Sequence, residues 1–394
     1  MQSRSPDELL QAAERAIAAR DAAAALGLLA QAESVAGPSE RLNMLRAIAF
    51  RTAGNLVAAI AAFDDVLDAQ PYNFMALLSK GTILEQMGNR DDAVDVYRNV
   101  IKIAPPEDHL PPPAVRQLAT ARNLVAATSA ELQANLLDAV ADIRRDLGDG
   151  DLRRFDEALG IFAGVRKPFV HEPLFFHYPQ LPAIPFYDRQ LFPWLEELEG
   201  ATDTIVSEML PALAIASASE LAPYIQYPKG VPVNQWVDLN HSTDWTSYFL
   251  WTDGDLQVRA KEQNPETFAV LDRLPLCDLT GYSPTVVFSV LQPHTHIPPH
   301  TGSTNVRLLT HLPLLLPGPA RFRVGNETRM WRMGEAWVFD DSIEHEAWND
   351  ADQQRVILIL DVWNPLLSEA ERLLVGRMLQ AFKTLRSGKV APLS

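Results

Sequence analysis

The hydrophobic pattern of this chain changes character part-way along its length. In the N-terminal third, apolar positions recur at helical spacing. The pair Gly-Asn at residues 54–55 returns at residues 88–89, a spacing of 34 residues. From about Ile225 onward, short runs rich in β-branched and aromatic residues are separated by turns, which predicts strands. The pattern therefore predicts an α+β multidomain chain, with helices first and a β-rich part second.

The helical part is an internal repeat. Further pairs of matched positions at the same spacing are Ala47 and Gly81, Ala59 and Ala93, Phe63 and Tyr97, and Pro71 and Pro105. This period and this residue order resemble the tetratricopeptide repeat, whose helix pairs stack into a superhelix. We predict such repeats over residues 1–110. Five prolines between Pro105 and Pro113 should break the array, and residues 111–155 are predicted to form a helical cap or linker.

The β-rich part is framed by predicted helices at residues 194–216 and 368–386. Its strongest strand predictions are residues 286–291, 306–316, 321–324, 336–339 and 356–363.

Composition narrows the functional classes. The formal net charge is −16, which argues against a nucleic-acid partner because phosphates require a basic face. The same charge disfavours a role on an anionic membrane surface. Cys277 is the single cysteine, which excludes an internal disulfide and favours a reducing compartment. The first thirty residues lack the apolar core of a signal peptide, so we expect a cytoplasmic protein without a membrane partner.

Candidate chemistry gathers around two histidines. His300 stands in the run His-Ile-Pro-Pro-His-Thr-Gly-Ser-Thr-Asn, and His345 in Phe-Asp-Asp-Ser-Ile-Glu-His-Glu-Ala-Trp-Asn-Asp. Arg355 follows ten residues after the second histidine, on an apolar strand where a charge is out of pattern. Neutral imidazole is a good ligand for Fe(II), and a fixed guanidinium can bind a carboxylate with two hydrogen bonds. A lone histidine beside proline is more often structural, so this reading depends on the combination.

The combination resembles a known family. The stretch from about Phe288 to Pro365 is similar to the aspartyl/asparaginyl β-hydroxylases, which are Fe(II)- and 2-oxoglutarate-dependent oxygenases on a double-stranded β-helix. The runs that carry the resemblance are His-Thr-Gly-Ser-Thr-Asn-Val-Arg-Leu (300–308), Gly-Asn-Glu-Thr-Arg-Met-Trp (325–331), Val-Phe-Asp-Asp-Ser-Ile-Glu-His-Glu (338–346) and Asp-Val-Trp-Asn-Pro (361–365). The resemblance implies a jelly-roll, cupin-like oxygenase domain, which we place at residues 156–394 with flanking helices.

The resemblance also implies an iron site. Most enzymes of this chemistry bind iron through two histidines and one carboxylate, the latter two positions after the first histidine. Here that position is Gly302, and the family shares this glycine. The family pattern assigns His300 and His345 as metal ligands. It assigns Asp341 as a catalytic-site residue that hydrogen-bonds the water in the vacant position.

Matching the remaining family positions implies a co-substrate pocket. In this pattern Arg355 and Ser289 hold the C5 carboxylate of 2-oxoglutarate, His311 lies near its C1 end, and Trp251 lines the wall. Animal members carry an arginine at the position that is Leu309 here. Since side chains alternate along a strand, Arg307 should share the face of residues 309 and 311 and could partly compensate.

The resemblance implies hydroxylation of an unactivated C–H bond with Fe(II), 2-oxoglutarate and O2. The repeats favour a peptide or protein substrate, with the β-carbon of Asp or Asn as the first hypothesis. A small molecule or a lipid acyl chain is the alternative substrate. Two alternatives of another class are a non-catalytic repeat scaffold that keeps a relic β-helix, and a cupin-like metal enzyme without 2-oxoglutarate, which would not need Arg355.

Overall fold

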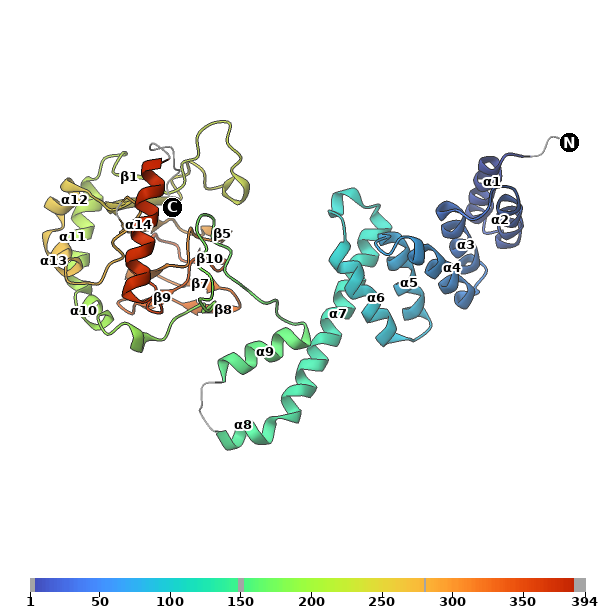
Figure 1. Ribbon diagram of the computed structural model, residues 1–394, viewed down its shortest axis with the longest axis horizontal. Coiled ribbons are helices and arrows are strands. Elements are labelled where there is room, and N and C mark those ends of the chain that lie inside the picture. Colours follow the sequence, from blue (N-terminus) through green and yellow to red (C-terminus); the bar gives the residue numbers. More distant parts are fainter. Residues whose placement is uncertain (1–3, 148–151, 280, 386–394) are drawn as a thin grey trace. The chain divides into compact units, whose positions relative to one another are not determined.

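The computed structural model describes residues 4–147, 152–279 and 281–385. The chain divides into two compact units, Met1–Arg166 and Lys167–Ser394 (Figure 1). The predicted boundary at residue 155 is therefore too early. It cuts helix α9 (Arg153–Ala163), which packs with helix α7 (Pro112–Ala139) of the first unit. The buried residues of α9 are Leu159, Gly160 and Ala163.

The first unit consists of antiparallel helix pairs, as the 34-residue period predicts. Its pairs are α1 (Pro6–Ala18) with α2 (Ala22–Ala36), α3 (Glu40–Thr52) with α4 (Leu56–Ala69), and α5 (Phe74–Gln86) with α6 (Arg90–Ile103). One of the matched positions, Gly81, is small for a steric reason. A Cβ on Gly81 would collide with the ring of Tyr97, the aromatic residue of the following helix.

The proline-rich segment ends the repeats and starts a long helix. A short 3₁₀ turn at Glu107–His109 precedes α7 (Pro112–Ala139), which begins with a proline in its first turn, where the missing N–H costs nothing. Helix α8 (Ala141–Leu147) follows. Of the predicted cap over residues 111–155, the described part is thus largely helical, and residues 148–151 lie outside the described residues.

The second unit is built on two antiparallel sheets. The larger has the order β1-β2-β4-β11-β6-β9, with β3 paired to β2, and the smaller has the order β5-β10-β7-β8. Strand bounds in the larger sheet are β1 Leu221–Pro223, β2 Trp245–Thr252, β3 Asp255–Leu256, β4 Val286–Leu291, β6 Arg307–Leu315, β9 Trp337–Phe339 and β11 Arg355–Trp363. In the smaller sheet they are β5 His296–His300, β7 Ala320–Val324, β8 Glu327–Met330 and β10 His345–Asn349.

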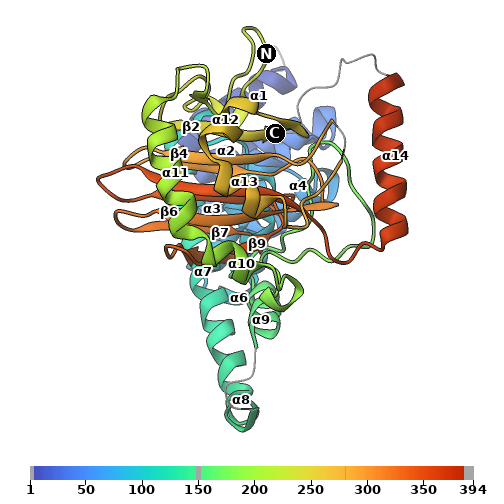
Figure 2. The ribbon, with the colours of Figure 1, turned by 90° about the vertical axis from the view of Figure 1, so that its left-hand side faces the viewer.

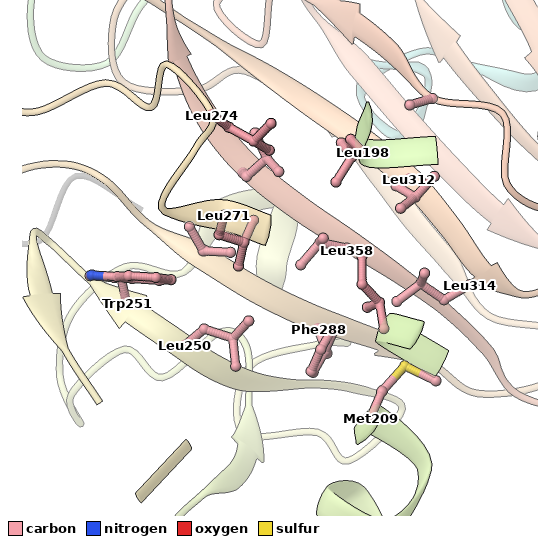
Figure 3. Close-up of a cluster of buried hydrophobic side chains, with 14 of the residues drawn as sticks. Leu198, Met209, Leu250, Trp251, Leu271, Leu274, Phe288, Leu312, Leu314 and Leu358 are labelled. Atoms are coloured by element: carbon pink, nitrogen blue, oxygen red, sulfur yellow. The ribbon is translucent and has the colours of Figure 1, made fainter. Parts of the chain in front are cut away.

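Helices cover one face of the larger sheet. They are α10 (Leu195–Gly200), α11 (Thr202–Ile215), α12 (Val258–Gln263) and α13 (Pro265–Leu271). Figure 3 shows Leu198 and Met209 of these helices beside Phe288 and Leu358 of the sheet, in one buried apolar cluster. Helix α14 (Glu369–Leu385) packs elsewhere, through Val375 and Leu379 onto a separate cluster, and stands apart from α11 in Figure 2.

The opposite face of the larger sheet meets the smaller sheet. Residues Val287, Leu291, Ile357 and Ile359 point into this second core, where Phe322 and Phe339 join them. Because side chains alternate along a strand, each central strand contributes to both cores. Within the described part of the chain, no helix is long and apolar enough to cross a membrane.

Candidate metal and co-substrate site

The two candidate metal ligands face each other across a strand pair. His300 ends β5, His345 begins β10, and the two are direct partners in the antiparallel ladder. Their ring centroids lie 4.0 Å apart. Each Nδ1 donates to the carbonyl two residues earlier, His300 to Pro298 at 2.8 Å and His345 to Ile343 at 2.9 Å. These bonds fix the proton on Nδ1 and leave both Nε2 lone pairs for a metal.

Burial keeps both rings neutral. It lowers the pKa of His345 to about 4, and burial together with neighbouring His345 lowers the pKa of His300 well below its ordinary value. Neutral imidazole is the form that coordinates a metal. The pair therefore fits a metal ion at neutral pH without first losing a proton.

Asp341 occupies the space that a third ligand from residue 302 would need. A Cβ on Gly302 would collide with the Asp341 carboxyl, and the Gly302 amide donates to the Asp341 carbonyl at 2.6 Å. Oδ1 of Asp341 is buried without a hydrogen-bond partner. Burial raises the pKa of this carboxyl to about 7, with Arg307 opposing and Asp340 and Asp361 adding to the shift. An unpartnered buried carboxyl oxygen beside two imidazoles fits a metal-bound water.

In the residues that the structure describes, no three His, Cys, Asp or Glu side chains converge as a metal-binding group.

Arg355 is a buried cation without an acidic partner among the described residues. It is 1% exposed, and burial alone lowers its pKa to about 9. Its nearest polar neighbour is Ser289, whose Oγ lies 3.3 Å from a guanidinium nitrogen. Trp245 donates its indole N–H to the same Oγ at 3.0 Å. A buried charge normally requires a counter-ion, so this arrangement is suited to bind an anion.

His311 and Arg307 share the pocket with Leu309, as strand alternation predicts. His311 is buried between Phe322 and Phe339, and its Nδ1 has no partner. Burial, with Arg355 and His345 nearby, lowers the pKa of His311 well below its ordinary value.

Arg307 is already engaged by acidic residues. Its guanidinium donates to Asp361 at 2.6 Å and lies 3.7 Å from Asp341. Burial opposes its charge, yet Asp361 and Asp341 outweigh burial and raise the pKa of Arg307. Arg307 is therefore a neutralised cation, in contrast to Arg355.

Of the site residues predicted from the sequence, all except Trp251 line one cavity of about 110 Å³. A water molecule occupies roughly 30 Å³ in the liquid, so the cavity has room for a small organic molecule. The metal ligands, the unpaired guanidinium and the aspartate thus open onto a common space.

Comparison with known proteins agrees with this geometry. The family model described as Aspartyl/Asparaginyl beta-hydroxylase matches residues 216–365, and a tetratricopeptide repeat model matches residues 10–74 and 44–108. The ornithine lipid ester-linked acyl 2-hydroxylase of Rhizobium tropici is 34% identical over 202 residues, covering 50% of this chain and 67% of that protein. The chain belongs to the aspartyl/asparaginyl β-hydroxylase family.

Other members match over shorter shares of their length. The human aspartyl/asparaginyl beta-hydroxylase is 38% identical over 146 residues, which cover 36% of this chain and 19% of that protein. The human aspartate beta-hydroxylase domain-containing protein 2 is 30% identical over 210 residues, covering 52% of this chain and 54% of that protein. The matched part thus spans about a fifth of the human enzyme.

One family-based assignment is wrong in this member. Trp251 does not reach the pocket; it stacks near Phe268 in the helix-covered core, with ring centroids 4.3 Å apart. The cause is a register shift in β2 between Phe249 and Trp251. Phe249 pairs with Val287 of the pocket side, whereas Trp251 pairs with Val286 of the opposite side. A bulge reverses the facing of every later residue.

Two other tryptophans of this chain form the wall instead. Trp245 binds Ser289 as described, and the ring of Trp236 lies 4.8 Å from that of His300. Tyr224 stacks on Trp245, with centroids 4.1 Å apart and planes 4° from parallel. Alternation along residues 245–249 could have placed Trp245 on the Ser289 face. Trp236 lies in a short 3₁₀ turn (Asn234–Trp236), for which periodicity gives no signal.

Proposed function

We propose that this chain is an Fe(II)- and 2-oxoglutarate-dependent hydroxylase. The observation that carries the proposal is the buried, unpaired Arg355, which faces the same cavity as the two paired histidines. A cupin-like enzyme without an acidic co-substrate would gain nothing from burying a guanidinium there, because burial disfavours an uncompensated charge by several kcal/mol. A dicarboxylate that spans metal and arginine accounts for both features.

Each residue then has a defined task. His300 and His345 hold the iron through Nε2. Arg355 and Ser289 bind the distal carboxylate, with Trp245 fixing the serine hydroxyl. When bound, iron and 2-oxoglutarate supply O2 activation and the oxidation of an unactivated C–H bond.

The rest of the pocket controls water and orientation. Asp341 accepts a hydrogen bond from water beside the histidines through its unpartnered Oδ1. Phe322 and Phe339 pack around His311 and exclude solvent from the co-substrate end. Exclusion of water strengthens the ionic contacts inside the site.

We propose a polypeptide as the substrate, held in part by the tetratricopeptide repeats. Such repeats form extended binding surfaces, and the net charge of −16 disfavours an anionic lipid surface. A fragment that starts at Lys167 retains every proposed iron and co-substrate residue. It should keep slow 2-oxoglutarate decay and lose turnover that depends on a polypeptide substrate. Equal hydroxylation rates for the fragment and the full chain would contradict this role of the repeats.

The pocket favours an uncharged reacting group, and therefore asparagine over aspartate. The arginines that line it in the described structure are Arg355, committed to the co-substrate, and Arg307, neutralised by Asp361. A substrate carboxylate would lose its hydration and meet no free cation, whereas an amide carries no net charge. Leu309 adds a neutral wall. Two peptide pools that are identical except for Asn or Asp at one position should stimulate succinate release to different extents, the Asn pool more strongly. Leu309→Arg should reduce that difference in succinate release.

A lipid or other acyl chain is the second candidate substrate. Its support is the apolar and aromatic lining near the metal ligands, including Trp236, Ile297 and Leu309, together with the acyl 2-hydroxylase activity for which the Rhizobium tropici relative is named. An octanoyl ester that stimulates succinate release more than either peptide pool would favour this candidate.

An anaerobic titration tests the proposed chemistry itself. Fe(II) and 2-oxoglutarate added together should give a weak visible charge-transfer band that neither gives alone. Arg355→Ala should lose the band at the 2-oxoglutarate concentration that saturates the wild type. Arg321→Ala, which removes a partly exposed arginine that pairs with Asp350, is the matched control. A wild-type protein that gives no band and no succinate would instead support a non-catalytic scaffold.

A further inference from the structure

A single segment fastens the loops that carry both metal ligands. This segment, residues 171–178, is here called the strap, and it lies beside β5 and β10 in Figure 1. The Glu172 amide donates to the carbonyl of Ser342, three residues before His345, at 2.7 Å. The Leu174 amide donates to Gly302, two residues after His300, at 2.9 Å. Two strap residues that are two positions apart therefore bind the two loops.

The strap makes further bonds on the His300 side. The amides of Phe175 and Phe176 both donate to the Ser303 carbonyl at 3.0 Å. Tyr178 and Asn305 exchange two hydrogen bonds, at 2.7 and 2.8 Å. The loop from Gly302 to Asn305 is thus held along its length by backbone that comes from outside the two sheets.

His171 joins the two loops through its side chain. Its Nε2 lies 3.1 Å from Oδ2 of Asp340 on the His345 loop. Its Nδ1 lies 3.1 Å from the side-chain amide of Asn305 on the His300 loop. The imidazole is 5% exposed and the Asp340 side chain 0%. Oδ1 of Asp340 accepts from the Ser342 hydroxyl at 2.6 Å. Oδ2 lies close to the His171 ring without an aligned hydrogen bond, so the second contact of the carboxylate is electrostatic.

We propose that His171 is a positioning residue for the metal site. The inference rests on the proposed iron site and concerns how its geometry is maintained. A site with two protein ligands cannot rely on a third ligand to fix the spacing of the two loops. The His171 bridge between Asp340 and Asn305 adds a side-chain link to the backbone bonds that already join the two loops. Its loss should therefore loosen the spacing of the two ligands without separating the loops. Groups that orient metal ligands typically contribute about 10- to 100-fold in metal affinity.

The wild-type protein gives the first test. Co(II) is added alone, and hydrogen exchange is followed by mass spectrometry for peptides that cover residues 171–178. Because linkage is reciprocal, metal binding should slow exchange of the five strap amides that donate to the loops. Peptides from α11, on the other side of the larger sheet, provide the internal reference. Slowed exchange in β5 and β10 with no change in the strap would overturn the inference.

Variants give the second test, with Co(II) affinity measured from the visible spectrum. His171→Ala should weaken Co(II) binding by about 10- to 100-fold. His171→Gln should restore most of it, because the glutamine amide can donate to Asp340 and accept from Asn305. His177→Ala is the matched control, since His177 is an exposed histidine of the same strap and should bind Co(II) like the wild type.

The outcomes separate this inference from the proposed function. Wild-type affinity in folded His171→Ala, or a glutamine variant as weak as the alanine variant, would refute the bridge while leaving the iron site in place. If the alanine variant does not fold, the glutamine variant and the exchange experiment still decide the matter. Failure of the wild-type protein to bind Co(II) would count against the iron site, and the positioning role would fall with it.

Discussion

The two faces of the larger sheet have opposite compositions, although the same strands build both. On the helix-covered face, β4 and β11 contribute Val286, Phe288, Leu358 and Leu360, all buried among apolar neighbours. On the other face, the residues in between include buried polar and charged groups. These are Ser289, Arg355 and Asp361 on β4 and β11, joined by Arg307 and His311 on β6.

The contrast separates stability from chemistry. Burial of aliphatic and aromatic side chains stabilises the fold by about 1.5–3 kcal/mol for each side chain. Burial of an unpaired guanidinium or of a carboxyl with a raised pKa opposes folding. Burial of the groups on the pocket face therefore costs folding free energy. Burial of the apolar side chains on the helix-covered face must offset that cost. Substitutions on the two faces should consequently affect different measurements.

The largest expected effect is loss of a metal ligand. His300→Ala or His345→Ala should abolish 2-oxoglutarate turnover, because either change leaves one protein ligand. The thermal unfolding temperature of the metal-free protein should change little, since neither variant removes apolar packing from the helix-covered face. Succinate release and a thermal melt are the two measurements. Activity above a few per cent of wild type in either variant would contradict the assignment.

The second-largest effect is expected from removing Arg355, the buried cation without an acidic partner among the described residues. Arg355→Ala should weaken 2-oxoglutarate binding by about 2–4 kcal/mol, roughly 30- to 1000-fold, with little effect on metal affinity. The metal-free variant should not be less stable than wild type, because the substitution removes an uncompensated buried charge. Isothermal titration with 2-oxoglutarate measures the first effect and a denaturant melt the second. Unchanged affinity for 2-oxoglutarate would remove Arg355 from the site.

A substitution on the helix-covered face should lower the stability of the fold and leave 2-oxoglutarate binding unchanged. Leu358→Ala, between Arg355 and Asp361 on β11 but facing the helices, should reduce the free energy of unfolding by about 2–5 kcal/mol. The fraction that remains folded should keep wild-type affinity for 2-oxoglutarate. Urea melts and titration below the melting temperature test both statements. A selective loss of affinity without loss of stability would mean that the two faces are not independent.

Periodicity predicted much of this framework. The predicted strand at residues 286–291 matches β4, and those near β6, β7, β9 and β11 lie within one or two residues of the observed bounds. The repeats were predicted from their spacing and are confirmed by the helix pairs and the family model. These features depend on local pattern and apolar burial, which a sequence displays directly.

The site was only partly accessible to the same reasoning. Trp251 was misplaced because a bulge is a one-residue event that leaves no periodic signature. Strands β5 and β10, which carry the histidines, were not among the predicted strands, since β5 holds two consecutive prolines. His171 lies far from both motifs in sequence, and its contacts with Asp340 and Asn305 exist only after folding. The ion pair between Arg307 and Asp361 likewise forms only in the folded chain.

The smallest expected effect is the pH dependence of the unfolding free energy that Asp341 contributes on the pocket face. Burial raises the pKa of this carboxyl from an ordinary 3.8 to about 7, so the folded state binds a proton that the unfolded state has released over that range. Stability from this group is present below pH 4 and declines as pH rises towards 7. Asp341→Asn cannot ionise and should avoid the decline. The difference in unfolding free energy between variant and wild type should therefore grow with pH between 4 and 7.

Other groups also titrate between pH 4 and pH 7. The quantity to measure is therefore the difference in unfolding free energy between the variant and the wild type. The lowered pKa of His345 makes stability fall as pH drops from 6.5 towards 4, but this effect is common to both proteins and cancels in the comparison. We expect the variant to gain about 2 kcal/mol relative to wild type between pH 5 and pH 7. Urea melts of the metal-free proteins at several pH values measure it. A difference that is constant with pH would show that Asp341 is ionised throughout, and that Arg307 compensates its charge more fully than the 3.7 Å separation indicates.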